Sequence, residues 1–445
     1  MVNRDQNIEV VRKVRILLVN PPIYDFSAFD FWLKPYGLLR VAGFLRNRAE
    51  FRLFDFLDPA SGATEGHGPL KRDAWGRGKF PSVVVDKPDA FSRLRRRYHR
   101  YGLTRDRFRE YLAAERMFDY VMIQSTMTYW YRGIKEVIED ILSISPKTKI
   151  ILGGNYATIC SDHARKLGAD LVIEGNRTAS LWKELGIEPD LHQPPLWEAY
   201  RSGELAFGVM RLSDGCPFRC TYCSVPSAFP NFTARPLGDV LEELYLLANL
   251  GVRNIAFYDD ALLFKPESVL LPFLDALERN HRPIRAFHTP NALNARFLNA
   301  RLARRMVDAG FQTFFIGFES GADNWQKTTG GKVYAREFES AVGHLLDAGI
   351  AGNRITCYLI TGHPLGDLQQ LESSMRAANA LGVRVMLSEF SPIPGTPDGE
   401  RCREWTDLDE PLNHNKTAFT RLMLGEERTQ ELKNLANELN HSLVR

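Results

Sequence analysis

The chain is organised around GCPFRCTYC, residues 215–223, which holds three of the six cysteines. Cys216, Cys220 and Cys223 are four and three residues apart, so one tight loop carries three thiols. Three thiolates can bind three irons of a cubane cluster and leave the fourth iron open to a ligand that is not protein. A structural zinc ion needs a fourth ligand, and the nearest histidines, His192 and His281, lie well outside the loop. A zinc knuckle or a set of unpaired core cysteines is the alternative.

Short apolar runs alternate with helical patterns on both sides of this loop, over residues 206–400. The predicted strands are residues 206–211, 254–258, 284–289, 313–318, 354–361 and 384–390. The helices predicted between them include residues 236–250, 299–309 and 335–348. Six strand–helix units predict a partial or full β/α (TIM-like) barrel, in which reactive loops follow the carboxyl ends of the strands. Residues 401–445 are polar and predict a short helical C-terminal segment.

The N-terminal part, residues 1–185, shows a second alternation of strands and helices. Its predicted strands are residues 14–20, 51–57, 120–124, 149–152 and 170–174, with a helix over residues 36–46. Apolar strands separated by helices predict a doubly wound, parallel, Rossmann-like α/β domain. No Gly-x-Gly-x-x-Gly follows the first strand, so NAD or FAD binding is not expected. Residues 186–205 read as a linker.

An insertion at about residues 58–117 interrupts this N-terminal pattern and is rich in Gly, Pro and Arg. Its stretch SRLRRRYHRYGLTRDRFREYL predicts a very basic helix. The favoured interpretation of its arginines is a solvated helix face, and the alternative is a site for a phosphorylated or carboxylated substrate or for RNA. The arginines concerned are Arg93, Arg95, Arg96, Arg97 and Arg100.

Composition excludes several classes of protein. The chain has 445 residues, enough for two or three domains, and a net charge of only +3, so nucleic acid is not an expected partner. No apolar run approaches the roughly 18 residues that would predict a membrane span, and the N-terminus lacks the pattern of a signal peptide. Six unevenly spread cysteines do not make a disulfide framework. A cytoplasmic location is expected.

The cysteine loop resembles that of the radical S-adenosylmethionine (SAM) enzymes, with Cys-x3-Cys-x2-Cys after a barrel strand and an aromatic residue before the last cysteine. The resemblance covers most of residues 206–400 and implies a 4Fe–4S cluster on the three cysteines. It also implies that SAM chelates the open iron and is cleaved reductively to methionine and a 5′-deoxyadenosyl radical. The residues that the resemblance places near SAM are Tyr222, Asp259, Asp260, Asn291, Glu319 and Ser320.

Other interpretations exist for several of these positions. Asp259 and Asp260 could be a helix N-cap pair, and Ser320 could cap the chain at a strand end. Another residue of interest is His363, in Gly362-His363-Pro364 after the fifth strand. A lone histidine is more often structural than a contact of the substrate.

The N-terminal segments resemble the cobalamin-binding domains that are fused to some radical SAM enzymes. The resemblance rests on Asn20-Pro21-Pro22 and on residues 124–128, 153–158 and 170–175. It implies cobalamin contacts from Ser125, Thr126, Met127, Thr128, Gly153, Gly154 and Gly175. The Asp-x-His-x-x-Gly signature for a cobalt-binding histidine is absent, and the closest match, Asp190-Leu191-His192, lacks the glycine. Relatives without that signature include both proteins that bind cobalamin and proteins that do not.

The aromatic residues 24–32 could cover a corrin face, wall the substrate cavity or plug a domain interface. The resemblance implies a cobalamin-dependent methyltransferase that methylates an unactivated carbon through the 5′-deoxyadenosyl radical and methylcobalamin. The nearest alternative is a radical SAM enzyme with a cobalamin-free N-terminal domain that catalyses cyclisation, C–C coupling or rearrangement. An alternative of another class is a non-catalytic corrinoid- or zinc-binding scaffold.

A methylthiotransferase is less expected, because it would need three N-terminal cysteines and only Cys160 precedes Cys216. The cluster chemistry implies a flavodoxin- or ferredoxin-type electron donor. The sequence does not distinguish small-molecule, peptide and lipid substrates.

Overall fold

The computed structural model describes residues 13–58, 71–201, 204–279 and 284–443. Its N-terminal part is a five-stranded sheet in the order β10-β9-β8-β1-β4, and every pairing is parallel. The strands are β1 (Val14–Asn20), β4 (Ala49–Asp55), β8 (Tyr120–Ser125), β9 (Lys149–Gly154) and β10 (Leu171–Ile173). The order corresponds to the doubly wound arrangement 2-1-3-4-5, which confirms the predicted class.

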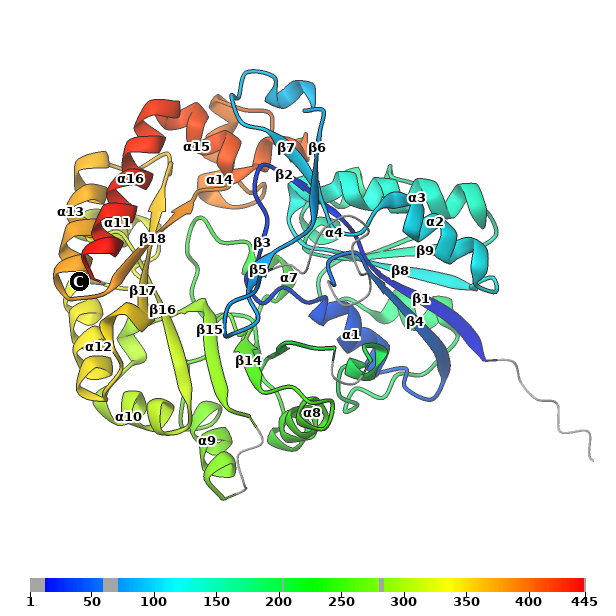
Figure 1. Cartoon of the computed structure of the whole chain (residues 1–445), viewed down its shortest axis with the longest axis horizontal. Helices are drawn as coiled ribbons and strands as arrows, with labels where there is room; N and C mark the ends of the chain where they lie inside the picture. Colours follow the sequence, from blue (N-terminus) through cyan, green and yellow to red (C-terminus); the bar gives the residue numbers. More distant parts are fainter. Residues whose placement is uncertain (1–12, 59–70, 202–203, 280–283, 444–445) are drawn as a thin grey trace, which may run out of the picture.

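Helices cover both faces of this sheet (Figure 1). Ile16 and Leu18 of β1 face one apolar layer, while Leu17 and Val19 face the other, as the two-residue period of a strand requires. The first layer includes α1 (Tyr36–Gly43) and α6 (Ala179–Leu185). The second includes α2 (Arg105–Ala114), α3 (Tyr131–Ile144), α4 (Asn155–Ile159) and α5 (Ser161–Arg165).

The second part is an open arc of six parallel strands whose neighbours follow chain order, which confirms a partial barrel. The strands are β11 (Gly208–Met210), β14 (Asn254–Phe257), β15 (Ala286–Leu293), β16 (Phe311–Glu319), β17 (Ile355–Thr361) and β18 (Arg384–Glu389). Helices surround the arc on its outer side (Figure 1). They are α8 (Leu237–Asn249), α9 (Leu270–Arg279), α10 (Ala300–Asp308), α12 (Ala335–Asp347) and α13 (Leu368–Ala380).

The predicted basic helix in the insertion is wrong over its first half. Residues 98–101 form β7 (Tyr98–Tyr101), the middle strand of an antiparallel sheet with β2 (Ile23–Asp25) and β6 (Ser82–Val85). Arg100 is buried and lies 2.7 Å from Glu136 of α3, so it is not on a solvated helix face. Gly102 has φ 108°, and a Cβ there would lie 2.6 Å from the carbonyl oxygen of Phe56, so the chain turns at this glycine. Helix α2 begins only after Thr104, whose side chain accepts a hydrogen bond from the Arg107 N–H.

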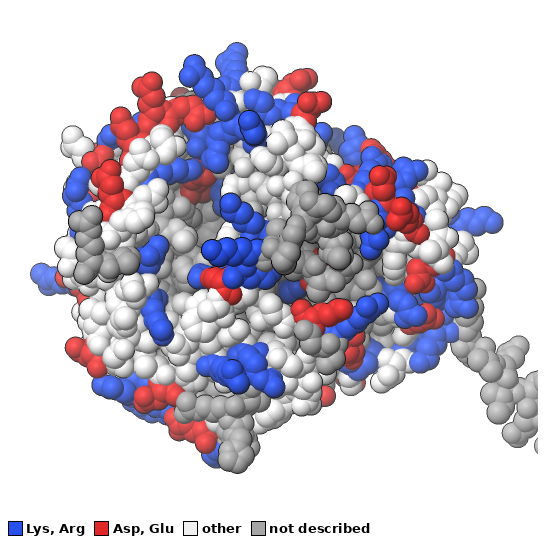
Figure 2. Space-filling model, in the orientation of Figure 1, with Lys and Arg blue, Asp and Glu red and all other residues white. Residues whose placement is uncertain are grey.

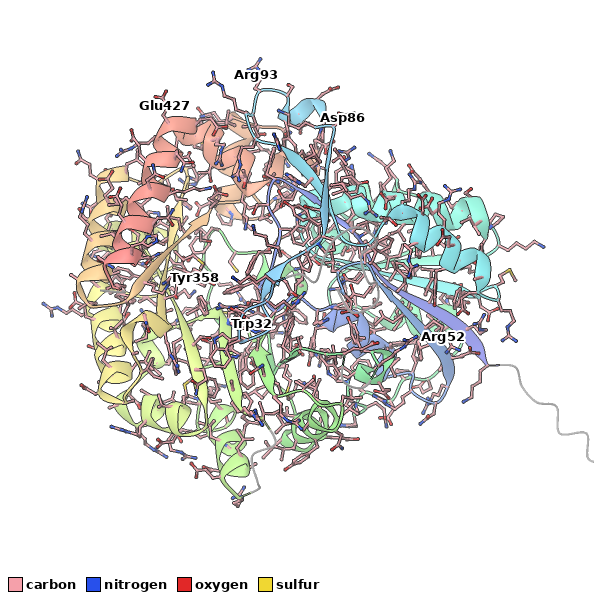
Figure 3. All side chains as sticks on the ribbon, in the orientation of Figure 1. Trp32, Arg52, Asp86, Arg93, Tyr358 and Glu427 are labelled. Carbon is pink, nitrogen blue, oxygen red and sulfur yellow. The ribbon has the colours of Figure 1, made fainter. Side chains whose placement is uncertain are left out.

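The open side of the barrel is filled by two aromatic segments from the N-terminal part. Strand β3 (Phe29–Asp30) pairs with β5 (Gly78–Lys79), and the chain then carries Trp32 into the barrel core. Trp32 has φ 60° and stacks on the buried His288 of β15, with ring centroids 4.6 Å apart. Figure 3 shows Trp32 near the middle of the molecule, between the barrel strands and the N-terminal sheet. Residues 24–32 had three interpretations. For Trp32, the structure shows the last of them, a plug in the interface between the two parts.

The segment predicted as a linker is part of this interface. Trp197 and Tyr200 are buried in the same apolar core as the barrel strands. The Trp197 indole N–H donates to Glu243 of α8 at 3.1 Å, and Arg235 lies 2.6 Å from the same carboxylate. Tyr36 of α1 also donates to Glu243, at 3.2 Å. One fully buried carboxylate therefore joins α1, the linker and the barrel.

The C-terminal segment is helical, as predicted, and bridges the two parts. Helix α16 (Glu426–Ser442) packs on β18 and α13, and Lys433 lies 2.7 Å from Glu389 at the end of β18. The 3-10 turn η8 (Pro411–His414) lies against η3 (Thr128–Trp130) at the edge of the N-terminal sheet. Within the described ranges, no helix combines the length and the apolar character needed to cross a membrane.

Candidate active site

The cysteine loop begins at a glycine turn beside the first barrel strand. It follows β11 and the short β12 (Ser213–Asp214). Gly215 has φ 78°, and a Cβ there would lie 2.4 Å from the carbonyl oxygen of Asn231, so no other residue fits this turn. All three cysteines of the loop are free and partly exposed. Burial raises the pKa of the Cys223 thiol to about 11, and the nearby Lys332 ammonium opposes this rise.

Backbone atoms of Thr329 and Gly330 pack directly against the cysteine loop. A Cβ at Gly330 would lie 3.0 Å from Cys220 Cα, and the Thr221 N–H donates to the Thr329 carbonyl at 3.2 Å. Across the described part of the chain, no three His, Cys, Asp or Glu side chains converge on one metal ion. Convergence is not needed for a cubane, because each thiolate binds a different iron. The donor set of three thiols in one partly exposed loop therefore fits a cluster with one open iron. His281, considered for zinc, lies outside the described residues.

Glu319 ends β16 in a conformation that is rare for a residue with a side chain. Its φ is 65°, and the pairing of β16 with β17 shifts register between Gly317 and Glu319. The buried carboxylate lies 3.4 Å from Lys332 Nζ. A Cβ at Gly317 would lie 2.8 Å from Glu319 Oε1 and 2.9 Å from Lys332 Nζ, so glycine makes room for this ion pair. Strained backbone of this kind is concentrated at functional sites.

Tyr222 and Glu319, predicted separately near SAM, line one cavity of about 290 Å³ at the barrel mouth. Its wall is largely apolar and aromatic with a few polar groups, as is usual for a small-molecule site. The other lining residues are Ala292, Tyr358, Ile360, Ser388, Glu389, Phe390, Ser391 and Ile393. Figure 2 shows a hollow between the barrel half and the centre of this face, with Lys and Arg side chains beside it. No sequence motif marks Tyr358 or Glu389, and only the structure places them in this cavity.

Asp259 and Asp260 hold the segment that leads into the cysteine loop. The buried Asp259 carboxylate accepts hydrogen bonds from the Ser213 N–H and hydroxyl at 2.7 and 2.6 Å. Burial raises its pKa to about 6, and the Ser213 hydroxyl limits the rise. Asp260 lies 3.2 Å from Arg211. No helix begins at these residues, since α9 starts at Leu270, so the N-cap alternative is wrong.

Asn291 and Ser320 lie at neighbouring strand ends. Asn291 is exposed near the end of β15 and donates to the Tyr258 carbonyl at 2.9 Å. Ser320 Oγ accepts from the Ala322 N–H at 3.2 Å, just before α11 (Asp323–Thr329). This bond closes the turn at the end of β16, as the alternative for Ser320 expected, while the N-cap of α11 is Ala322 and has no side-chain cap. SAM contacts from these residues stay a prediction.

His363 uses both ring nitrogens inside the protein. Nδ1 accepts from the Leu365 N–H at 3.1 Å, so Nε2 carries the proton and donates to Asp398 at 3.1 Å. The same Asp398 oxygen accepts from the Thr221 hydroxyl, and the Asp398 N–H donates to the Thr221 carbonyl at 3.0 Å. Thr221 lies between Cys220 and Tyr222. His363 and Asp398 thus position the cysteine loop, and no ring nitrogen is left for a substrate.

We expect Asp398→Ala to raise the KM for SAM about tenfold, equivalent to about 1.4 kcal/mol. The substitution releases Thr221 and leaves a buried His363 N–H without an acceptor, so Tyr222 in the cavity wall is no longer held. Asp398→Asn keeps an oxygen that can accept both hydrogen bonds and should stay near the parent. SAM-cleavage kinetics and the cluster's electron paramagnetic resonance spectrum check this. The control is Asp367→Ala, which removes only the N-cap of α13. An equal KM for SAM in Asp398→Ala and the parent would contradict the positioning role of Asp398.

Two of the residues predicted to contact cobalamin are engaged in internal contacts instead. The buried Ser125 hydroxyl donates to the Gly153 carbonyl at 2.8 Å and accepts from the Ala157 N–H at 3.1 Å. The buried Thr128 hydroxyl lies 3.0 Å from His414 Nδ1, beneath the C-terminal turn. The Thr128 contact depends on the tertiary structure, because η8 lies almost 300 residues further along the chain and packs on this sheet edge. A corrin could not touch Thr128 unless η8 moved.

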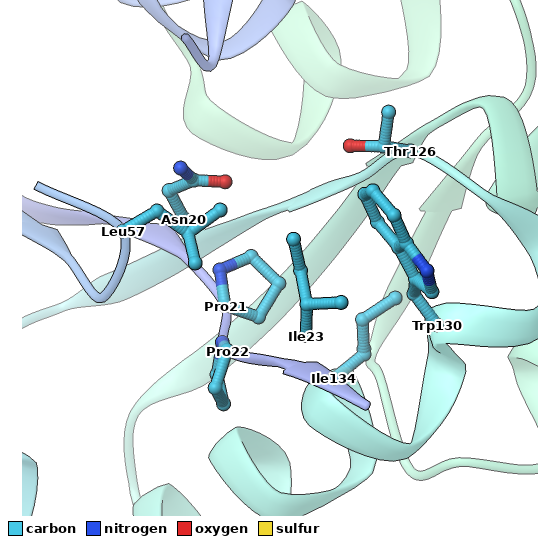
Figure 4. Close-up of a pocket in the computed structure, with 8 residues that line it drawn as sticks. All are labelled: Asn20, Pro21, Pro22, Ile23, Leu57, Thr126, Trp130 and Ile134. Atoms are coloured by element: carbon cyan, nitrogen blue, oxygen red, sulfur yellow. The ribbon is translucent and has the colours of Figure 1, made fainter. Parts of the chain in front are cut away.

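The remaining predicted positions lie along a more open edge. Thr126 lines a cavity of about 10 Å³, room for one water, where β1 and β8 diverge. Figure 4 shows Thr126 and Trp130 on one side of it and Asn20 and Pro21 on the other. Met127 and Gly154 are exposed, and Gly154 has φ 107°. His192 is exposed and pairs with Asp239 of α8 at 3.1 Å, in the linker rather than at this edge.

Glycines leave this edge free for a flat ligand. A Cβ at Gly153 would meet only Ile173 Cβ, 3.8 Å away, and one at the exposed Gly37 only Gln124 Oε1, 3.7 Å away. A large ring could approach the backbone here, at the carboxyl ends of β8 and β9. The residues therefore fit a corrinoid along the glycine edge but not in the cavity beside Thr126.

Fold and site together define a partial β/α barrel with a three-cysteine loop, joined to a doubly wound domain, and residues 210–378 match the radical SAM superfamily. Among curated proteins, an uncharacterized methyltransferase of Pyrococcus horikoshii is 23% identical over 202 residues, 45% of this chain and 42% of that protein. The ribosomal protein uS12 methylthiotransferase RimO of Carboxydothermus hydrogenoformans is 28% identical over 154 residues, 30% of this chain and 34% of RimO. The chain thus matches less than half the length of these relatives.

Two solved structures share most of the fold. TsrM, a radical SAM methyltransferase from Kitasatospora setae with cobalamin and a 4Fe–4S cluster bound, has a TM-score of 0.65 and 15% identity. The match covers 88% of this chain and 75% of TsrM. OxsB, a cobalamin-dependent SAM radical enzyme with aqua-cobalamin and SAM bound, has a TM-score of 0.57 and 11% identity, over 96% of this chain and 61% of OxsB. Residues 210–378 of the chain are therefore a radical SAM domain. Enzymes of this superfamily use a 4Fe–4S cluster and SAM.

Proposed function

We propose that this enzyme is a cobalamin-dependent methyltransferase that methylates an unactivated carbon. One juxtaposition carries the proposal: Gly175, which follows β10 at the same end of the sheet, packs so closely on Ala228 that a Cβ there would lie 2.8 Å from the Ala228 carbonyl oxygen. Ala228 ends α7 (Val225–Ala228), which directly follows Cys223. The predicted corrinoid edge and the segment that follows the cysteine loop therefore lie side by side, which supports a reaction that uses both cofactors.

When bound, the cluster and SAM supply the radical that removes a hydrogen atom from the substrate, and cobalamin supplies the methyl group that replaces it. The protein itself binds and orients the cofactors and the substrate, and it excludes water from the site. The three cysteines would hold the cluster, and Tyr222 and Glu319, which is paired with Lys332, would form the SAM side of the cavity. Trp32 and its neighbours close the barrel interior, which keeps water away from a reactive radical.

The relatives support the cobalamin part of the proposal. TsrM and OxsB contain cobalamin in their structures, and their fold covers both parts of this chain. The relative from Pyrococcus horikoshii is named a methyltransferase. The favoured partner for cluster reduction is a flavodoxin- or ferredoxin-type donor, and the substrate is a small molecule, peptide or lipid.

The test is the cobalt and iron content of the chain after anaerobic preparation with cobalamin. We expect about four irons and one cobalt per chain. Gly153→Phe places a ring on the open edge and should lower the cobalt content severalfold without changing the iron. Gly238→Phe is the control, because a Cβ at Gly238 of α8 meets nothing within 4 Å and Gly238 lies away from this edge.

Four irons without cobalt in the parent chain would replace this proposal with the cobalamin-free radical SAM enzyme. Cobalt that binds equally to Gly153→Phe would mean that the corrinoid does not use the glycine edge. In the parent, transfer of a labelled methyl group from SAM to a carbon of a candidate substrate then identifies the reaction.

A further inference from the structure

The protein covering the cysteine loop is thin at one place on the surface. Gly330 is exposed, and a Cβ there would lie 3.0 Å from Cys220 Cα and 3.2 Å from the Arg219 carbonyl oxygen. On this side only the backbone of Gly330 lies between the surface and the backbone of the partly exposed Cys220. Electron transfer weakens steeply with distance, so a donor must dock where the covering is thinnest.

Positively charged side chains surround this place. Arg219 is exposed and donates to the carbonyls of Pro230 at 2.8 Å and Cys216 at 3.3 Å, which fixes its guanidinium on the loop. Lys327 is exposed one helical turn before Gly330 in α11, and Lys265 is exposed beside Phe264. In the described structure, none of these three cations has an ion pair with a carboxylate.

A fourth cation and partly buried aromatic rings complete the surface. Arg296 is exposed, donates to the Gly331 carbonyl at 2.7 Å and pairs with Glu337 at 2.8 Å. The rings of Phe218 and Phe264 each lie within 6.0 Å of the ring of Phe297. Aromatic residues and arginine are enriched at protein interfaces, and cations around them favour an acidic partner.

We propose that this cysteine-loop patch is the docking site of a small acidic flavodoxin-type protein that reduces the cluster. The patch consists of Phe218, Arg219, Phe264, Lys265, Arg296, Lys327 and Gly330. One electron passes from the reduced flavin, which is oxidised by one electron, to the cluster, which is reduced by one electron. Electron-transfer complexes commonly bury less than about 1,200 Å², so a patch of this kind is sufficient. The inference rests on the cluster of the proposed function and is independent of cobalamin.

The test compares two reductants for the cleavage of SAM. The variant is Lys265→Glu/Lys327→Glu, which leaves the cysteine loop and the cavity untouched. We expect the KM for a reduced, strongly acidic bacterial flavodoxin to rise about tenfold at low ionic strength. The difference should shrink at 0.15 M salt, where the screening length is about 8 Å. With titanium(III) citrate, a small reductant that needs no docking site, the rate should equal that of the parent.

Arg376→Glu provides the matched control, because Arg376 is exposed on α13 and lies outside the patch. An unchanged KM for flavodoxin in the double variant, or an equal rise in Arg376→Glu, would overturn the proposal. A loss of cleavage with titanium(III) citrate would also overturn it, since the lysines would then act on the cluster itself. The readout is SAM cleavage normalised to iron, so a failure to bind cobalamin leaves this test intact.

Discussion

Cys220→Ala will lose reductive cleavage of SAM to the background rate, and its iron content will fall well below that of the parent. Cys220 is the middle cysteine of the loop and the one that packs against Gly330. Without its thiolate, one iron of the cubane has no protein ligand. Cleavage of SAM needs an electron from the cluster, so activity and iron are lost together. The measurement is 5′-deoxyadenosine formed with titanium(III) citrate, with iron and sulfide determined on the same sample.

Cys160→Ala is the matched control for this loss. Cys160 is also a free, half-buried cysteine, but it lies between α4 and α5 of the N-terminal part. We expect it to keep both the iron and the cleavage rate. Full iron with undiminished cleavage in Cys220→Ala would refute the assignment of Cys220 as a ligand of the cluster.

Glu243→Ala will lower the free energy of unfolding by about 3–5 kcal/mol, the usual cost of removing one partner of a buried ion pair. Glu243 is fully buried and lies 2.6 Å from Arg235, whose guanidinium would keep its charge in an apolar interface. Tyr36 and Trp197 lose their acceptor as well. Because these residues come from α1, the linker and the barrel, the variant should also loosen the contact between the two parts. Chemical denaturation and limited proteolysis in the linker measure the two effects.

Glu242→Ala is the control, since Glu242 is the exposed neighbour in the same helix. Its unfolding free energy should stay within about 0.5 kcal/mol of the parent. Glu243→Gln keeps the acceptor oxygen for Trp197 but not the charge, and we expect an intermediate loss. Equal stability of Glu243→Ala and the parent would show that water or a shifted side chain compensates Arg235.

The sequence alone determined the order of strands and helices in both parts and the location of the cluster loop. These features are local. The two-residue alternation of Ile16 to Val19 and the spacing of Cys216, Cys220 and Cys223 depend on neighbours in the chain. The same locality explains the wrong helix over residues 92–101: its composition suited a helix, but a strand was stabilised by the distant Glu136.

Only the tertiary structure decided how the site is assembled. Thr128 matched a cobalamin segment, yet it meets His414, 286 residues away. His363 was a lone histidine in sequence, and its role became defined when its ring bonded to Asp398, which also accepts from Thr221. Lys332 gained its partner because Gly317 left space for the Glu319 side chain. These are hydrogen bonds and ion pairs between residues far apart in the chain, and their free energy depends on burial and distance, which no local pattern of residues records.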